Sequence, residues 1–156
     1  MIRPLGRGDR SPLRDLVAAT GVFTDAEVAI ALELIDAVLD VPAQKDYIIR
    51  VFEEEGKVAG YYCVGPTPAT DGTFDLYWVA VDPSLQGKGI GRALDDHACD
   101  LIRGMSGRLI VAETSSLPRY SRTRDFYLRR GYGELARIAD YYRPGDDLVV
   151  YGKYLT

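Results

Sequence analysis

The stretch DPSLQGKGIGRAL, residues 82–94, combines glycines with basic and amide side chains in a pattern that could bind an anion. It follows an apolar, strand-like run and opens a segment with helical periodicity. Glycines at such a junction let free backbone N–H groups close around a ligand, and the helix N-terminus adds a positive dipole. Gln86 offers an amide, and Lys88 and Arg92 offer positive charge. These residues predict a phosphate-binding loop.

Two common phosphate loops do not fit this stretch. The mononucleotide pattern GxxxxGK[ST] needs Gly-Lys-Ser or Gly-Lys-Thr, and the sequence contains neither. The dinucleotide pattern GxGxxG needs a third glycine where Arg92 stands. Nucleotide hydrolysis is therefore disfavoured, and the alternative to an anion site is a tight turn that lets the helix pack closely.

The wider stretch VAVDPSLQGKGIGRAL resembles the Q/R-x-x-G-x-G/A signature for acetyl-CoA binding in the GNAT superfamily of N-acetyltransferases. Gln86, Gly89 and Gly91 occupy the motif positions, and the rest of the chain presents its elements in the order of that family. The resemblance implies an α/β (α+β), GNAT-like fold. Its central mixed, mostly antiparallel sheet would have about six to seven strands, flanked by about four helices, in one domain over residues 1–156.

The resemblance also implies acetyl-CoA as co-substrate. In that family the loop N–H groups hold the coenzyme pyrophosphate, and a splay between the fourth and fifth strands admits the pantetheine arm. Backbone groups of the fourth strand would pair with that arm, as a bulged strand allows. The implied coenzyme-binding residues are Val79, Val81, Gln86, Gly87, Lys88, Gly89, Ile90, Gly91, Arg92 and Tyr120.

A tyrosine in the segment DFYLRRGY carries the implied catalytic role. Tyr127 aligns with the tyrosine that protonates the departing thiolate in many family members, and the alternative is a tyrosine packed on the sheet. Upstream, Tyr120 and Thr123 replace the Asn and Ala that the family commonly has. The Tyr120 hydroxyl could take the place of that asparagine, and Arg122 or Arg124 could meet the ribose phosphate unless both lie on a solvated helix face.

A proton acceptor for the amine is less clearly marked. Glu113 is the main candidate, because it ends the strand that would flank the thioester. Side-chain alternation places only one of Glu113 and Thr114 toward the cleft, and a water chain would also serve. Asp75, at the start of the central strand, is a second candidate.

The acceptor amine, from a small molecule or a peptide, is expected against the amino-terminal helices and the loop at residues 65–72. Acidic residues of the second helix could attract a cationic amine or form a solvated face: Glu27, Glu33, Asp36 and Asp40. The segment YYRPGDDLVVY could line the same cavity, or form core and a homodimer contact. Direct acetyl transfer in a ternary complex is the favoured function, and a non-catalytic acetyl-CoA sensor is the alternative.

Periodicity places the elements that must position these residues. Thr24 and Glu27 form a capping box before a helix with one apolar face. Residues 45–81 predict an antiparallel meander of three strands. In its third strand, alternation assigns Phe74, Leu76, Trp78 and Ala80 to one face and Tyr77, Val79 and Val81 to the other. A helix up to Gly104, a buried strand, a helix before Gly131 and a terminal hairpin follow.

Composition excludes several other classes. The 156 residues carry a net charge of -4, which argues against a general nucleic-acid binder. No apolar run approaches the roughly 20 residues of a membrane helix, and a cytoplasmic protein is expected. Cys63 and Cys99 are expected to be buried thiols and His97 a structural histidine, so no metal site is expected.

Overall fold

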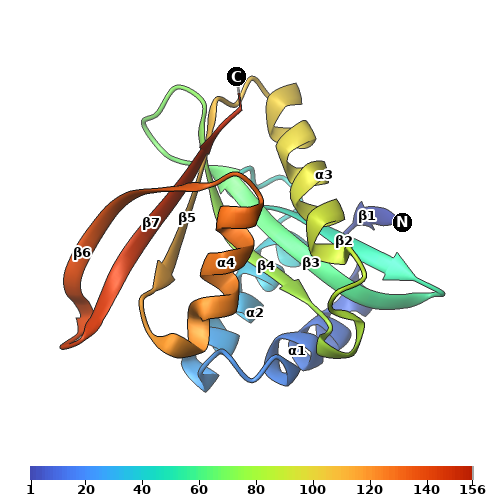
Figure 1. The fold of residues 1–156 in the computed structure, drawn as a ribbon. Coiled ribbons are helices and arrows are strands. Elements are labelled where there is room, and N and C mark those ends of the chain that lie inside the picture. Colours follow the sequence, from blue (N-terminus) through green and yellow to red (C-terminus); the bar gives the residue numbers. More distant parts are fainter. Residues whose placement is uncertain (156) are drawn as a thin grey trace.

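A seven-stranded sheet forms the centre of the protein in the computed structural model, which describes residues 1–155 (Figure 1). Its strand order is β1-β2-β3-β4-β5-β7-β6, and only the β4–β5 pair is parallel. This mixed sheet with four α-helices confirms the expected fold class. The strands are β1 (Ile2–Pro4), β2 (Ile48–Glu54), β3 (Lys57–Pro66), β4 (Thr73–Val81), β5 (Leu109–Ser115), β6 (Gly133–Arg143) and β7 (Asp146–Tyr154).

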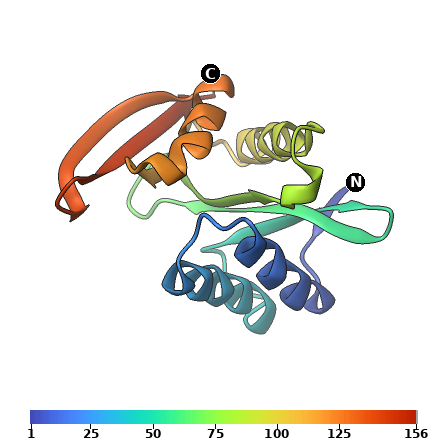
Figure 2. The ribbon, with the colours of Figure 1, turned by 60° about the horizontal axis from the view of Figure 1, so that its bottom comes forward.

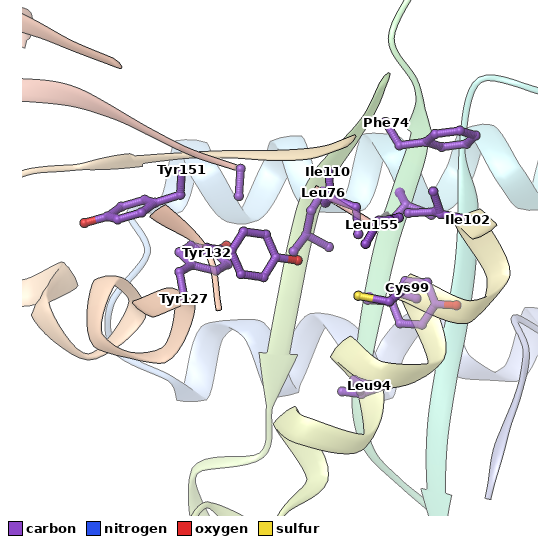
Figure 3. Packing of buried hydrophobic residues seen from close by; sticks show 14 of the residues in the cluster. Phe74, Leu76, Leu94, Cys99, Ile102, Ile110, Tyr127, Tyr132, Tyr151 and Leu155 are labelled. Carbon is purple, nitrogen blue, oxygen red and sulfur yellow. The ribbon is translucent and has the colours of Figure 1, made fainter. Parts of the chain in front are cut away.

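Two helices cover each face of the sheet (Figure 2). The helices are α1 (Arg10–Ala19), α2 (Asp25–Asp40), α3 (Ile90–Gly104) and α4 (Ser121–Arg129), with short 3-10 turns η1 (Arg7–Asp9), η2 (Pro83–Leu85) and η3 (Pro118–Tyr120). One core lies between the sheet and α1 and α2, and includes Ile35 and Tyr61. The other lies beneath α3 and α4, and includes Leu94 and Ile110 (Figure 3).

Local signals fix several element boundaries. The Thr24 side chain accepts a hydrogen bond from the Glu27 N–H, and the Glu27 carboxylate accepts one from the Thr24 N–H, so the predicted capping box begins α2. Gly131, with a φ of 87°, follows the end of α4, as expected for a glycine just past a helix. The part of the chain that the structure describes contains no helix long and apolar enough to cross a membrane.

A β-bulge in β4 changes which side chains share a face. Cys63 of β3 pairs with Trp78 while Val64 pairs with Leu76, so Tyr77 is an extra residue on β4. As a result Leu76 lies with Val79 beneath α3 and α4, whereas Trp78 packs toward α1 and α2. The prediction that Leu76 and Trp78 point the same way was wrong, because strict alternation fails across a bulge.

The strands β4 and β5 separate soon after they begin. Their pairing covers only Thr73–Asp75 against Leu109–Val111, although β4 continues to Val81 and β5 to Ser115. Figure 1 shows the two strands diverging, with α4 in front of the space between them. The later part of β4 therefore has backbone groups on its β5 side that this neighbouring strand does not pair.

Candidate functional site

The loop before α3 presents backbone donors at one end of the separated strands. Gly87 and Gly89 have φ values of 80° and 82°, in the left-handed region that favours glycine. Gly89 is the N-cap of α3, and the first helical hydrogen bond runs from the Ala93 N–H to the Gly89 carbonyl, at 3.0 Å. The preceding N–H groups, those of Ile90 to Arg92, therefore have no carbonyl within the helix and face outward at its positive end.

A cavity of about 860 Å³ lies beside this loop. Its walls come from the end of β4, the glycine loop and first turn of α3, the outer side of α4, and the segment that joins α1 to α2. A Cβ at Gly91 would lie 3.1 Å from Phe126 Cε2, so the missing side chain lets α4 approach the start of α3. The lining of the cavity thus runs from the glycine loop to the edge of β4.

Arginine side chains make the rim of this larger cavity positive. Arg92, Arg122, Arg129 and Arg130 line it, together with the single carboxylate Asp125. Arg122 Nη1 donates to Gln86 Oε1 at 3.3 Å, which links α4 to the glycine loop. Guanidinium groups and free N–H donors on one rim suit a ligand with several phosphates.

A network around Asp95 fixes α4 relative to α3. The Asp95 side chain is buried and accepts hydrogen bonds from Arg130 Nε at 3.0 Å, Tyr132 Oη at 2.8 Å and Lys153 Nζ at 3.1 Å. Arg130 also pairs with Asp96 and lines the larger cavity. Because a buried carboxylate is stable only when paired, this network holds the two helices that enclose the cavity at a fixed separation.

A second cavity, of about 380 Å³, lies next to the first where the two strands separate. Phe23, Val79 and Thr123 line both cavities. The smaller cavity extends between α2, the middle of β4, the end of β5 and the β6–β7 turn, and its walls include Glu113 and Tyr127. The two cavities are therefore neighbours, and the residues that line both of them mark their junction.

Comparison with known proteins agrees with this geometry. The sequence profile described as the acetyltransferase (GNAT) domain matches residues 45–134, which is more than half of the chain. The chain belongs to the GNAT family of acetyltransferases. It is therefore an acyl-CoA-dependent N-acetyltransferase by class. A search of curated protein sequences gave no match.

Solved structures place this GNAT domain among similar folds. A Desulfovibrio desulfuricans protein assigned to the GNAT family shares 40% sequence identity, with a TM-score of 0.94 over 100% of this chain and 99% of that chain. The Escherichia coli ribosomal-protein-S18-alanine N-acetyltransferase has 19% identity and a TM-score of 0.78, covering 100% and 94%. Salmonella typhimurium YncA, solved with acetyl-CoA, has 22% identity and a TM-score of 0.75, covering 100% and 94%. The last two show the fold alone.

The structure brings together most of the residues predicted to bind the coenzyme in this GNAT domain. Eight of them line the larger cavity: Val79, Val81, Gln86, Gly87, Gly89, Ile90, Gly91 and Arg92. Lys88 is on the same loop with an exposed side chain. Tyr120 lines the smaller cavity instead, and its hydroxyl donates to Glu27.

Arg124, one of the two arginines expected near the ribose phosphate, has a structural contact instead. Its Nη1 donates to the carbonyls of Ser115 and Leu117, both at 2.8 Å, and these hydrogen bonds stabilise the turn before α4.

Tyr127 lies at the wall of the smaller cavity with its ring in the core. The residue is 5% exposed, and its ring centroid lies 5.2 Å from that of Tyr132 and 5.6 Å from that of Tyr151 (Figure 3). Within residues 1–155 its hydroxyl forms no hydrogen bond. Burial, and then the Asp95 carboxylate, raise the pKa of Tyr127 well above its usual value, so the phenol stays protonated.

Glu113 is exposed and lines the smaller cavity, as do Thr114 and Ser115. Alternation predicts that only one of the Glu113 and Thr114 side chains faces the cleft. Both residues belong to the lining, Glu113 exposed and Thr114 buried. Asp75 lies outside both cavity linings and accepts from Thr67 Oγ1 at 2.8 Å.

Sequence reasoning did not single out several residues of the smaller cavity. Phe23, Trp78 and Tyr142 line it, and so does Asp146, whose side chain is buried against the Ser115 hydroxyl. Only the aromatic segment YYRPGDDLVVY carried a signal, since it was one of the segments that could line a cavity. The described residues contain no cluster of three or more His, Cys, Asp or Glu side chains able to hold a metal ion.

Proposed function

We propose that this protein transfers an acetyl group from acetyl-CoA directly to an amine in a ternary complex. The observation that carries the proposal is the junction of two cavities at Phe23, Val79 and Thr123. One cavity has an anion-binding loop at its rim, and the other has a phenol and a carboxylate on its walls. Two substrates bound on either side would meet without a covalent enzyme intermediate.

The lining of the larger cavity supports its assignment as the coenzyme site. The loop from Gln86 to Arg92 would receive the pyrophosphate on its free N–H groups, and the unpaired edge of β4 at Val79 and Val81 would hydrogen-bond the pantetheine arm. When bound, acetyl-CoA supplies the activated acyl group as a thioester. Arg122 and Arg129 would offset the charge of its phosphates.

Tyr127 and Glu113 would handle the two protons of the reaction. Glu113 accepts, directly or through a water, the proton that the amine nitrogen loses as it bonds to the acyl carbon. Tyr127 donates its phenolic proton to the sulfur as the carbon–sulfur bond breaks. Its raised pKa keeps the phenol protonated until the sulfur departs, and the phenoxide that remains regains a proton from water because it is a stronger base than a thiolate.

Coenzyme release coupled to amine acetylation tests this function. We expect acetyl-CoA and a primary amine to yield free thiol and an equal amount of amide, the thiol measured with a chromogenic disulfide and the product by mass spectrometry. The amines should include small alkylamines and a peptide with a free N-terminus. Binding of acetyl-CoA without turnover on any of them would instead indicate a sensor of the coenzyme.

A further inference from the structure

The smaller cavity has an unusual lining for its volume of about 380 Å³. Six aromatic side chains contribute to its walls: Phe23, Tyr77, Trp78, Tyr120, Tyr127 and Tyr142. Three carboxylates accompany them: Glu27, Glu113 and Asp146. Aromatic faces and carboxylates are the two kinds of group that attract an organic cation.

Glu27 is held in a fixed orientation by α2 and η3. Its Oε1 accepts from the Thr24 N–H at 3.1 Å, and its two oxygens lie 2.8 and 3.0 Å from the Tyr120 hydroxyl. Burial, and then Glu27 itself, raise the pKa of Tyr120 to about 12, so this hydroxyl remains a donor. The Phe23 ring packs edge-on against the Trp78 ring, with 4.8 Å between the ring centroids, and its centroid lies 6.5 Å from that of the Tyr120 ring. The Glu27 carboxylate is thus bound to Tyr120, whose ring lies near that of Phe23.

Two arginines also line the cavity, and each is already engaged. The Arg119 guanidinium lies 5.1 Å from the centre of the Tyr120 ring. Arg143 Nε lies 3.8 Å from Asp146, the carboxylate that also accepts from Ser115. Asp146 is therefore ion-paired, whereas within residues 1–155 neither Glu27 nor Glu113 forms an ion pair, so these two carboxylates keep a negative charge for a ligand.

Glu113 and Tyr127 are two groups of this lining that have no partners. Within residues 1–155, Glu113 forms no ion pair or hydrogen bond, and neither does the hydroxyl of Tyr127, a residue that is only 5% exposed and lines this cavity. Burial, and then the charge of Glu113, raise the pKa of Tyr142, with smaller effects from Asp146 and Glu27. The carboxylates therefore surround one small space rather than separate surfaces.

We infer that this cavity selects a small amine that carries a second positive charge, with Glu27 holding the distal cation while the reacting nitrogen faces Glu113 and Tyr127. The inference rests on the proposed function and names its substrate class. A fixed carboxylate in a cavity that Phe23 and Trp78 also line suits a static cation. An unpaired carboxylate suits proton transfer, because it has a free lone pair. The two acidic groups therefore have different tasks.

Three amines of equal chain length test the distal charge. Cadaverine ends in a second ammonium, pentylamine in a methyl group and δ-aminovalerate in a carboxylate. We expect kcat/KM for cadaverine to exceed that for pentylamine about tenfold, and kcat/KM for δ-aminovalerate to fall about tenfold below that for pentylamine, because the distal end group is positive, neutral and negative in turn. Equal values for the three amines, or the reverse order, would overturn the inference.

Two substitutions separate the tasks of the two carboxylates. Glu27→Gln removes the charge and keeps the capping box, since glutamine serves at that position. The substitution should reduce the ratio of kcat/KM for cadaverine to kcat/KM for pentylamine from about ten to about one. Glu113→Gln should lower kcat/KM for all three amines by a similar factor and leave the ratio intact. Glu33→Gln, on an exposed part of α2 outside both cavities, is the matched control and should change neither quantity. A ratio unaffected by Glu27→Gln would contradict the assignment.

Calorimetry with acetyl-CoA distinguishes the two levels of failure. If the protein binds acetyl-CoA and acetylates monocharged or peptide amines as well as cadaverine, the inference fails and the proposed function stands. If acetyl-CoA binds but none of the three amines is acetylated, the inference also fails. If acetyl-CoA does not bind, the proposed function fails and the inference fails with it. Thermal unfolding of each variant shows whether its fold is retained.

Discussion

Replacing Tyr127 by phenylalanine is expected to lower kcat about a hundredfold to ten-thousandfold, the range that a positioned general acid contributes. The substitution removes only the hydroxyl of a residue that lines the smaller cavity, and this hydroxyl has no hydrogen-bond partner within residues 1–155. The ring would keep its contacts with Tyr132 and Tyr151. The affinity for acetyl-CoA should therefore change little. Initial rates measured at saturating acetyl-CoA would give the decrease in kcat.

Tyr151→Phe provides the matched control for this substitution. Tyr151 is buried beside Tyr127 and lies outside both cavity linings, so its hydroxyl should not affect kcat. The pH dependence gives a second check. Because burial raises the pKa of Tyr127, its proton is retained as pH rises through the ordinary tyrosine value of ~10, and kcat should not fall there through loss of the acid. Equal activities of the wild-type enzyme and the Tyr127→Phe variant would remove Tyr127 from the mechanism.

Gly89→Val should weaken acetyl-CoA binding about tenfold to a hundredfold. Gly89 has a φ of 82° at the N-cap of α3, and a β-branched residue there costs roughly 1–3 kcal/mol of backbone strain. The loop would relax to a conformation in which its N–H groups no longer converge, and binding would have to restore the strained one. Each 1.4 kcal/mol corresponds to about a tenfold change in the dissociation constant, which calorimetry measures directly.

Gly104→Ala is the matched glycine substitution at the other end of α3. A methyl group at Gly104 would meet open space, and Gly104 is not among the residues with positive φ, so acetyl-CoA affinity should be unchanged. A Cβ at Gly89 would have no neighbour within 4 Å either, which separates backbone strain from steric clash as the cause. Unaltered affinity in Gly89→Val would mean that the coenzyme does not depend on this loop conformation.

Features encoded by neighbouring residues could be predicted from the sequence. The capping box of Thr24 and Glu27, the glycine after α4 and the glycine loop before α3 each depend on contacts within a few positions along the chain. The same holds for the order of strands in the meander, which short turns impose. For these features, residue type and spacing along the chain are enough to predict the structure.

Features that depend on residues far apart in the chain could not be predicted from the sequence. Glu27 is 93 residues from Tyr120, yet their hydrogen bond places an α2 carboxylate in the smaller cavity. Asp36 and Asp40, on the same acidic helix, instead pair with Arg10 and Arg7. The bulge at Tyr77 inverts the later part of β4, and nothing in the alternating pattern marks where the extra residue falls. Tertiary pairing decides each of these cases.

Amide hydrogen exchange tests most directly whether this loop holds the coenzyme diphosphate. Acetyl-CoA should slow exchange at the N–H groups from Gln86 to Arg92, several of which lack helical partners, and along the edge of β4 at Val79 and Val81. Pantetheine, which has no diphosphate, should not protect the loop. Protection by acetyl-CoA at other sites, with the Gln86–Arg92 amides exchanging as in the free protein, would contradict the account.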